Sequence, residues 1–141
     1  MKVIGFNFSK ISVEKKGPMD KQPEVKTSVN IPEIKEVPSD LFKTKEVPLE
    51  VTFSYLITYE PKIAELSFEG SLMLLIDPKE AKEILKNWKE KNMQEEFKVF
   101  VFNVILRKAN IKALQLEDEM GLPAHFQMPS LKIQKQEKPS K

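Results

Sequence analysis

Apolar and polar residues alternate along much of the first half of the chain, a pattern typical of β-strands that bury one face. In residues 47–59 every odd position is apolar, and the even positions from Glu50 onward are polar except for Leu56. After Pro61 the apolar side chains move to even positions, in residues 66–76. Because proline fixes φ and cannot extend a hydrogen-bonded ladder, residues 59–62 are predicted to form the turn of an antiparallel hairpin.

Two further strands are predicted upstream of this hairpin. Residues 25–31 alternate in the same way, and their strand is predicted to end at Pro32. The first segment is apolar at Ile4, Phe6 and Phe8, and the pattern then shifts by one position, so a β-bulge is predicted near Ser9-Lys10. Two stretches with proline are predicted to be the connections, residues 15–23 and 36–48.

The hydrophobic period changes from 2 to 3.6 after the fourth strand. Asp77, Pro78 and Glu80 supply an N-cap acceptor, a proline at the first helical position and a glutamate two residues later. Apolar residues follow at helical spacing, from Ala81 to Trp88. We therefore predict one amphipathic helix here, with its lysines facing solvent.

A second helix is predicted in the apolar stretch of residues 97–121. Its Val and Phe content favours a strand, but its length without proline and the glycine at its end, Gly121, favour a helix. One apolar stripe runs along this helix, formed by Phe97, Val101, Val104, Ile105, Ala109, Ala113, Leu116 and Met120. Other large apolar residues lie off that stripe, namely Val99, Phe100, Phe102 and Leu106.

These four off-stripe residues make the first turns of the long helix apolar nearly all round. A helix of this kind needs cover on two sides. One side can pack on the sheet, and the other must meet another chain, a client or an additional element. Val99, Phe100, Phe102 and Leu106 are therefore the candidate oligomer or partner interface.

The expected fold is one α+β domain over residues 1–133, a four-stranded antiparallel sheet followed by a short and a long C-terminal helix. Residues 121–129 contain two prolines and are predicted to run as an extended segment over this body. Residues 134–141 are charged, contain no large apolar residue and are predicted to be a disordered tail.

The composition excludes several kinds of chemistry. The 141 residues include no Cys and one His, which excludes disulfides, thiolate nucleophiles, zinc–cysteine sites and a multi-histidine metal site within one chain. No apolar run is long enough for a membrane helix or for a signal peptide, so a cytoplasmic protein is expected, with no membrane insertion. The Lys and Glu bias resembles the composition of hyperthermophile proteins.

The charge distribution argues against nucleic acid as a partner. The chain has 23 basic and 21 acidic residues, and Arg107 is the single arginine. Arginine is the residue favoured for bidentate contacts to phosphates and bases. The four glycines are isolated, so we expect no phosphate-binding loop and no cofactor.

Candidate catalytic groups are few. His125 has no second histidine to work with and is expected to be structural. The run Glu117-Asp118-Glu119 is expected to be solvated, because it lies near a helix C-terminus, where carboxylates are unfavourable. A small enzyme with two buried carboxylates remains a third hypothesis, but no catalytic or metal-binding residue is singled out.

The order of these elements resembles that of the SecB export chaperone and the wider SecB-like family, which includes toxin–antitoxin-associated chaperones. The likeness covers roughly residues 1–133. It is carried by FSKISVEKKGP after Phe6, QPEVKTSVNI at residues 22–31, the hairpin from Glu50 to Ile76 and GLPAHFQMPSL at residues 121–131. The resemblance implies oligomerisation and binding of unfolded polypeptide along exposed apolar surface.

The leading hypothesis is therefore a non-enzymatic holdase-type chaperone that binds unfolded or nascent polypeptide, as a homo-oligomer of two or four subunits. The alternative is a structural or adaptor protein of the same fold with one dedicated protein partner. Four other apolar residues are expected to contribute a client-binding surface, namely Leu56, Met73, Leu75 and Phe126.

Overall fold

The computed structural model describes residues 1–19, 22–38 and 45–127. It contains four strands followed by two helices, which confirms the predicted α+β class. The predicted domain boundary at residue 133 and the predicted tail lie outside the described residues. The elements are β1 (Lys2–Lys15), β2 (Glu24–Glu36), β3 (Val47–Glu60), β4 (Ala64–Ile76), α1 (Pro78–Lys89) and α2 (Glu95–Glu119).

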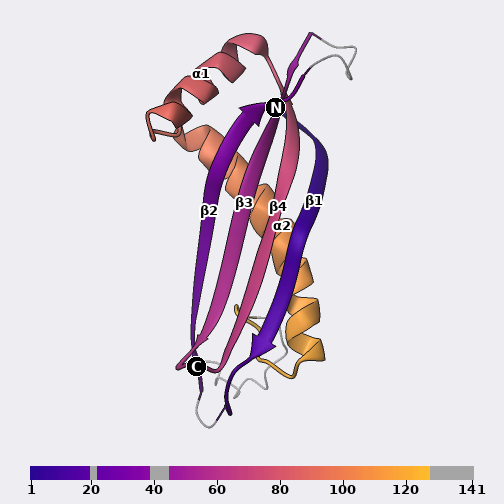
Figure 1. Ribbon diagram of the computed structural model, residues 1–141, viewed down its shortest axis with the longest axis vertical. Coiled ribbons are helices and arrows are strands. Elements are labelled where there is room, and N and C mark those ends of the chain that lie inside the picture. Colours follow the sequence, from indigo (N-terminus) through magenta and orange to yellow (C-terminus); the bar gives the residue numbers. More distant parts are fainter. Residues whose placement is uncertain (20–21, 39–44, 128–141) are drawn as a thin grey trace, which may run out of the picture.

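The four strands form one antiparallel sheet in the order β1-β4-β3-β2. The long helix α2 crosses one face of this sheet diagonally, and α1 lies beyond one end of the sheet beside β2 (Figure 1). No helix of the described part covers the opposite face. The sheet therefore has a core face toward α2 and an outer face.

The central hairpin is formed as predicted. Alternate residues of β3 and β4 are buried on the core face, with Val51 paired to Leu72. The turn closes where the backbone N–H of Ile63 donates to the carbonyl of Tyr59 at 2.9 Å. Lys62 takes a left-handed φ of 45° in this turn. The shift of the apolar positions at Pro61 thus marks the reversal of the chain.

The two edge strands contain irregularities, one of them predicted. In β1 the register shifts between Phe8 and Lys10, which confirms the predicted bulge, and it shifts again between Val3 and Gly5. The prediction that the second strand ends at Pro32 is wrong. The strand continues to Glu36, because an edge strand tolerates a residue without an N–H at an irregularity in its ladder.

Both helices begin or end with the local signals that the sequence carries. Asp77 caps α1, since its Oδ2 accepts from the backbone N–H of Lys79 at 3.2 Å. At the end of α2, Gly121 adopts a φ of 68°, and the N–H of Leu122 donates to the carbonyl of Glu117 at 2.8 Å. This is the Schellman arrangement, and it confirms the helix prediction for this segment.

The line of contact between α2 and the sheet advances four residues at a time. The residues of α2 with almost no exposure are Phe97, Val101, Ile105, Ala109, Ala113 and Glu117. Because four residues turn an α-helix through about 400°, this line rotates by about 40° at each step. Rotation of this kind allows a straight helix to follow a twisted sheet over many residues. Five residues of the predicted apolar stripe belong to this buried row, whereas Val104, Leu116 and Met120 are half-buried beside it.

Aromatic rings fill the core face around Gly70 of β4. Gly70 pairs with Phe8 on one side and Phe53 on the other. The ring centroids of Phe6 and Phe53 are 5.2 Å apart, and those of Phe8 and Phe53 are 6.1 Å apart. A Cβ at position 70 would lie 2.9 Å from the Phe53 ring and would clash with the carbonyl oxygen of Asn7. The absence of a side chain here lets the rings close over the strand.

Gly70→Ala is expected to lower the free energy of unfolding by about 2 kcal/mol or more, because backbone atoms of β1 must move to admit the methyl group. The matched control is Gly5→Ala, whose added Cβ would lie at an ordinary 3.7 Å from Met73. Urea unfolding followed by circular dichroism measures both variants. Equal stabilities for the two variants would contradict this account of Gly70.

Candidate functional site

The four residues predicted to form an interface lie along the flanks of α2. Val99 is 50% exposed. Phe100 and Phe102 are half-buried against the part of the core around Phe97, and Leu106 is half-buried against the part around Tyr59. The chain therefore covers part of this surface itself, and the interface role of the four residues stays a prediction.

Three hollows along α2 share lining residues and so form one groove, which we call the α2 groove. Its α2 wall is a row at four-residue spacing, Lys98, Phe102, Leu106 and Asn110. The middle hollow has a volume of about 530 Å³ and contains Val99, Phe102 and Leu106. The groove thus brings together three of the four residues predicted for the interface. Phe100 and Glu96 line a further hollow, which shares Glu95, Val99 and Asn103 with the middle hollow and so adjoins the groove.

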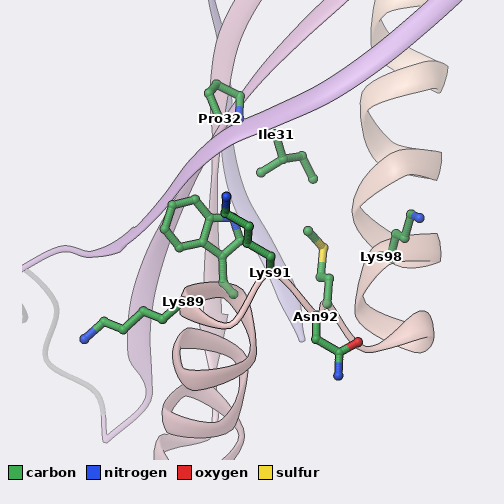
Figure 2. Close-up of a pocket in the computed structure, with 8 residues that line it drawn as sticks. Ile31, Pro32, Lys89, Lys91, Asn92 and Lys98 are labelled. Atoms are coloured by element: carbon green, nitrogen blue, oxygen red, sulfur yellow. The ribbon is translucent and has the colours of Figure 1, made fainter.

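One end of the groove lies at the connection between α1 and α2. This hollow, of about 790 Å³, lies between Ile31 and Pro32 of β2, the end of α1 and the first turn of α2 (Figure 2). Trp88 and Met93 line it as well. Its polar lining residues are Lys89, Lys91, Asn92 and Lys98. This end combines apolar surface with several positive charges.

The other end of the groove lies against the segment that follows α2. The hollow here has a volume of about 270 Å³ and is lined by residues that include Thr27, Tyr55 and Leu106. His125 and Phe126 form its wall, with their ring centroids 4.8 Å apart. Phe126 is thus placed in the same groove as the α2 residues.

The other three residues of the predicted client surface lie elsewhere. Leu56, Met73 and Leu75 alternate with buried neighbours, so they point to the outer face of the sheet. Leu56 pairs with Ser67, which is six residues from Met73 along β4, a separation of about 20 Å. The structure therefore does not bring the four residues of that prediction into one surface.

A buried polar network holds the segment after α2 in place. Glu117 Oε2 accepts from the Tyr59 hydroxyl at 2.8 Å and lies 2.7 Å from His125 Nδ1. The backbone N–H of His125 donates to Glu117 Oε1 at 3.4 Å. The Tyr59 hydroxyl shares its one proton between Glu117 Oε2 and the carbonyl oxygen of Pro123. These contacts join the sheet, the helix and the wall of the groove.

The prediction that Glu117 is solvated is wrong, whereas Asp118 and Glu119 are exposed as expected. Glu117 follows Ala113 by four residues and so continues the buried row of α2. The signal that sequence analysis missed is this spacing, together with Tyr59 at a core-facing position of its strand. A carboxylate is tolerated there because it accepts several hydrogen bonds.

His125 has both ring nitrogens engaged. Its Nε2 lies 2.7 Å from Asn110 Oδ1, which also accepts from the Tyr55 hydroxyl at 2.7 Å. The side chains of His125 and Glu117 are 3% and 2% exposed. No ring nitrogen is therefore free to contact a substrate or a metal ion in this arrangement. The contacts fit the structural role expected for His125.

The network changes the acidity of both tyrosines. Burial, reinforced by the charge of Glu117, raises the pKa of Tyr55 to about 12. Burial and the hydrogen bond to Glu117 raise the pKa of Tyr59 far above its ordinary range. Both hydroxyls therefore stay protonated, and able to donate, at any physiological pH.

Other chemistry finds little support in the described part of the chain. It contains no group of three or more side chains suited to a metal ion. Among its carboxylates and amines, the side chain of Glu117 is the one that is buried. None of the helices in the residues searched is long and apolar enough to cross a membrane.

Comparison with known proteins gives no relative. No protein-family model, no curated protein and no solved structure matches this chain.

Glu117→Ala is expected to lower the free energy of unfolding by about 3 kcal/mol, because it leaves Tyr59 and His125 buried without their shared acceptor. The matched control is Glu119→Ala, which removes an exposed carboxylate two residues further along α2. It should change stability by less than about 0.5 kcal/mol. Urea unfolding at neutral pH measures both. Similar values for the two variants would show that the network contributes little.

The folded protein is expected to lose stability as pH rises above 10. The unfolded chain then releases its tyrosine protons while the folded chain retains them, so the free energy of unfolding falls by about 1.4 kcal/mol per pH unit for each retained proton. Tyr55 and Tyr59 are the two tyrosines of the chain, so tyrosinate absorbance reports on both directly. If the tyrosines of the folded protein ionised near pH 10, as those of the urea-unfolded protein do, the burial of these hydroxyls would be contradicted.

Proposed function

We propose that this protein is a SecB-like holdase, which binds segments of non-native polypeptide in the α2 groove and needs no nucleotide to do so. The observation that supports the proposal best is the continuous groove, whose apolar surface includes Trp88 and Met93 at one end, Phe102 and Leu106 in the middle and Phe126 at the other end. Grooves of this kind on single chains mark binding sites.

Apolar burial is a suitable basis for binding unfolded chains. Its free energy is non-directional and amounts to roughly 25 cal/mol per Å² of surface removed from water, so it accepts many sequences. Three asparagines line the groove, Asn92, Asn103 and Asn110. Side-chain amides both donate and accept, and they match the peptide groups of an extended client.

Self-association is part of the proposal. The flank of α2 that adjoins the middle of the groove carries Phe100 beside Glu96, in a hollow of about 520 Å³ that shares Val99 with the groove. We propose that a second subunit covers this flank in a cytoplasmic dimer or tetramer. The two ends of the groove, which share no lining residue with this flank, would then remain open to clients.

A dedicated partner protein is the second candidate. It is favoured by the network of Tyr59, Glu117 and His125, which fixes the wall beside Phe126 by several hydrogen bonds. A wall held in this way suits one partner of defined shape better than many clients. Affinity purification distinguishes the two, since a dedicated partner is recovered in a fixed stoichiometry.

The double variant Phe102→Ser/Leu106→Ser, at two residues outside the Phe100 hollow, is expected to suppress the aggregation of a denatured client at least fivefold less well than the natural chain. The reason is the loss of apolar surface in the middle of the groove. Light scattering of the client, with the protein at several concentrations, measures the effect, and a thermal melt verifies that the variant is folded.

The matched control for this experiment is Ile111→Ser. Ile111 is 63% exposed on the same helix and lines none of the hollows that form the groove. It should leave suppression unchanged. The proposal fails if the natural chain does not suppress aggregation at several-fold excess, or if the control loses as much activity as the groove variant.

A further inference from the structure

We infer that the end of the α2 groove between α1 and β2 selects polypeptide segments in which an apolar side chain is flanked by aspartate or glutamate. The inference rests on the proposed function, because it names the class of segment that the same groove prefers. It is drawn from the shape, the charge and the backbone of the hollow around Trp88.

The hollow can hold apolar side chains. Its apolar lining consists of Ile31, Pro32, Trp88 and Met93, contributed by β2, by α1 and by the connection between the helices. Figure 2 shows Ile31 and Pro32 on the strand, with the helix connection facing them and Lys98 on α2 across the hollow. The volume of about 790 Å³ lies in the usual range of ligand sites.

The rim of the hollow is positively charged. Lys89, Lys91 and Lys98 line it, and no aspartate or glutamate of the described residues does so. None of these three lysines forms an ion pair within residues 1–19, 22–38 and 45–127. The ammonium group of Lys98 lies 5.7 Å from the centroid of the Phe102 ring. Lysines beside apolar surface favour carboxylates that arrive with apolar side chains.

Acidic residues lie close to this rim in sequence but outside the hollow. Glu90 separates Lys89 from Lys91 and is exposed, and Glu33 follows Pro32 on the strand and is also exposed. Glu95 lines the middle hollow together with Lys98. The positive charge is therefore concentrated on the hollow itself and falls off along the groove.

The backbone of Lys91 fixes the position of its side chain at the end of α1. Lys91 has a φ of 57° and follows α1 in a Schellman arrangement, in which the N–H of Asn92 donates to the carbonyl of Asn87 at 2.8 Å. Gly121 occupies the equivalent position after α2. Glycine adopts this conformation without steric cost, whereas lysine does not. Lys62 adopts the same backbone region in the hairpin turn, so the conformation of Lys91 serves to end α1 and places its side chain at the rim.

The edge of β2 argues for capture by side chains instead of strand addition. Pro32 has no N–H, and the ladder of β2 is irregular between Asn30 and Glu33, beside the hollow. A proline and an irregularity in an edge strand both disfavour the addition of a client strand past this point. The segment is then held by its apolar side chain in the hollow and by its carboxylates on the lysines.

Trp88, the single tryptophan of the chain, lines the hollow and reports on its occupation. The probes are three tryptophan-free peptides with the same Leu/Phe centre and with flanking aspartates, glutamines or lysines. We expect the aspartate peptide to bind about tenfold more tightly than the glutamine peptide at low salt, and the lysine peptide to bind most weakly. The difference should shrink as the ionic strength is raised.

Two kinds of variant test the assignment to these lysines. Lys89→Gln/Lys98→Gln should abolish the preference for the aspartate peptide, while the glutamine peptide binds as before. The matched control is Lys82→Gln/Lys86→Gln, at exposed positions of α1, which should leave the preference unchanged. Lys91→Gly should reduce the preference and raise the urea midpoint. A preference for the aspartate peptide that survives all rim substitutions overturns the inference.

The remaining outcomes separate this inference from the proposed function. Equal binding of the aspartate and glutamine peptides overturns the charge selection and leaves peptide binding in place. Failure of all three peptides, together with failure to suppress client aggregation, overturns both. Binding of vesicles of anionic phospholipid without binding of any peptide assigns the lysines to lipid and also overturns the inference.

Discussion

The packing of α2 on the sheet through a single row at four-residue spacing is the constraint on which the rest of the structure depends. Phe97, at the start of the row, packs against the core face, and Ala113, near its end, is small. Small residues at that end leave room for the tyrosines of β3, which hydrogen-bond α2 through Asn110 and Glu117. The same row therefore fixes the helix, the buried network and the segment that follows the helix.

A contact line one residue wide cannot cover an apolar helix. The residues beside the line remain half-buried or exposed, and on one flank they form the α2 groove. The sheet is too narrow on this side to close the groove, because β2 is its edge strand. Any change that widened the contact, such as a larger residue at Ala109, would lift the helix and alter the groove.

Local signals made most of the fold predictable, and the failures occur where distant residues decide. The hairpin turn, the bulge near Ser9-Lys10 and the cap at Asp77 depend on a few neighbours in sequence, and each was recognisable there. The burial of Glu117 depends on Tyr59, 58 residues away in sequence. Phe126 lies away from the outer face of the sheet, where Leu56 lies, because of the path that the chain takes after α2. The continuation of β2 through Pro32 likewise depends on its place at the edge.

Two features of the groove are unfavourable when considered as local structure. The carboxylate of Glu117 is removed from water at one end, and Lys91 adopts a left-handed backbone conformation at the other. Glu117 is compensated by its hydrogen bonds, which also hold the wall beside Phe126, whereas the described residues offer Lys91 no ion pair. Glu117 has its partners within the fold, whereas the charge of Lys91 has none among the described residues. This difference in charge pairing, beside a hollow lined by three lysines, is the physical basis for our proposal that the hollow at Lys91 binds a ligand.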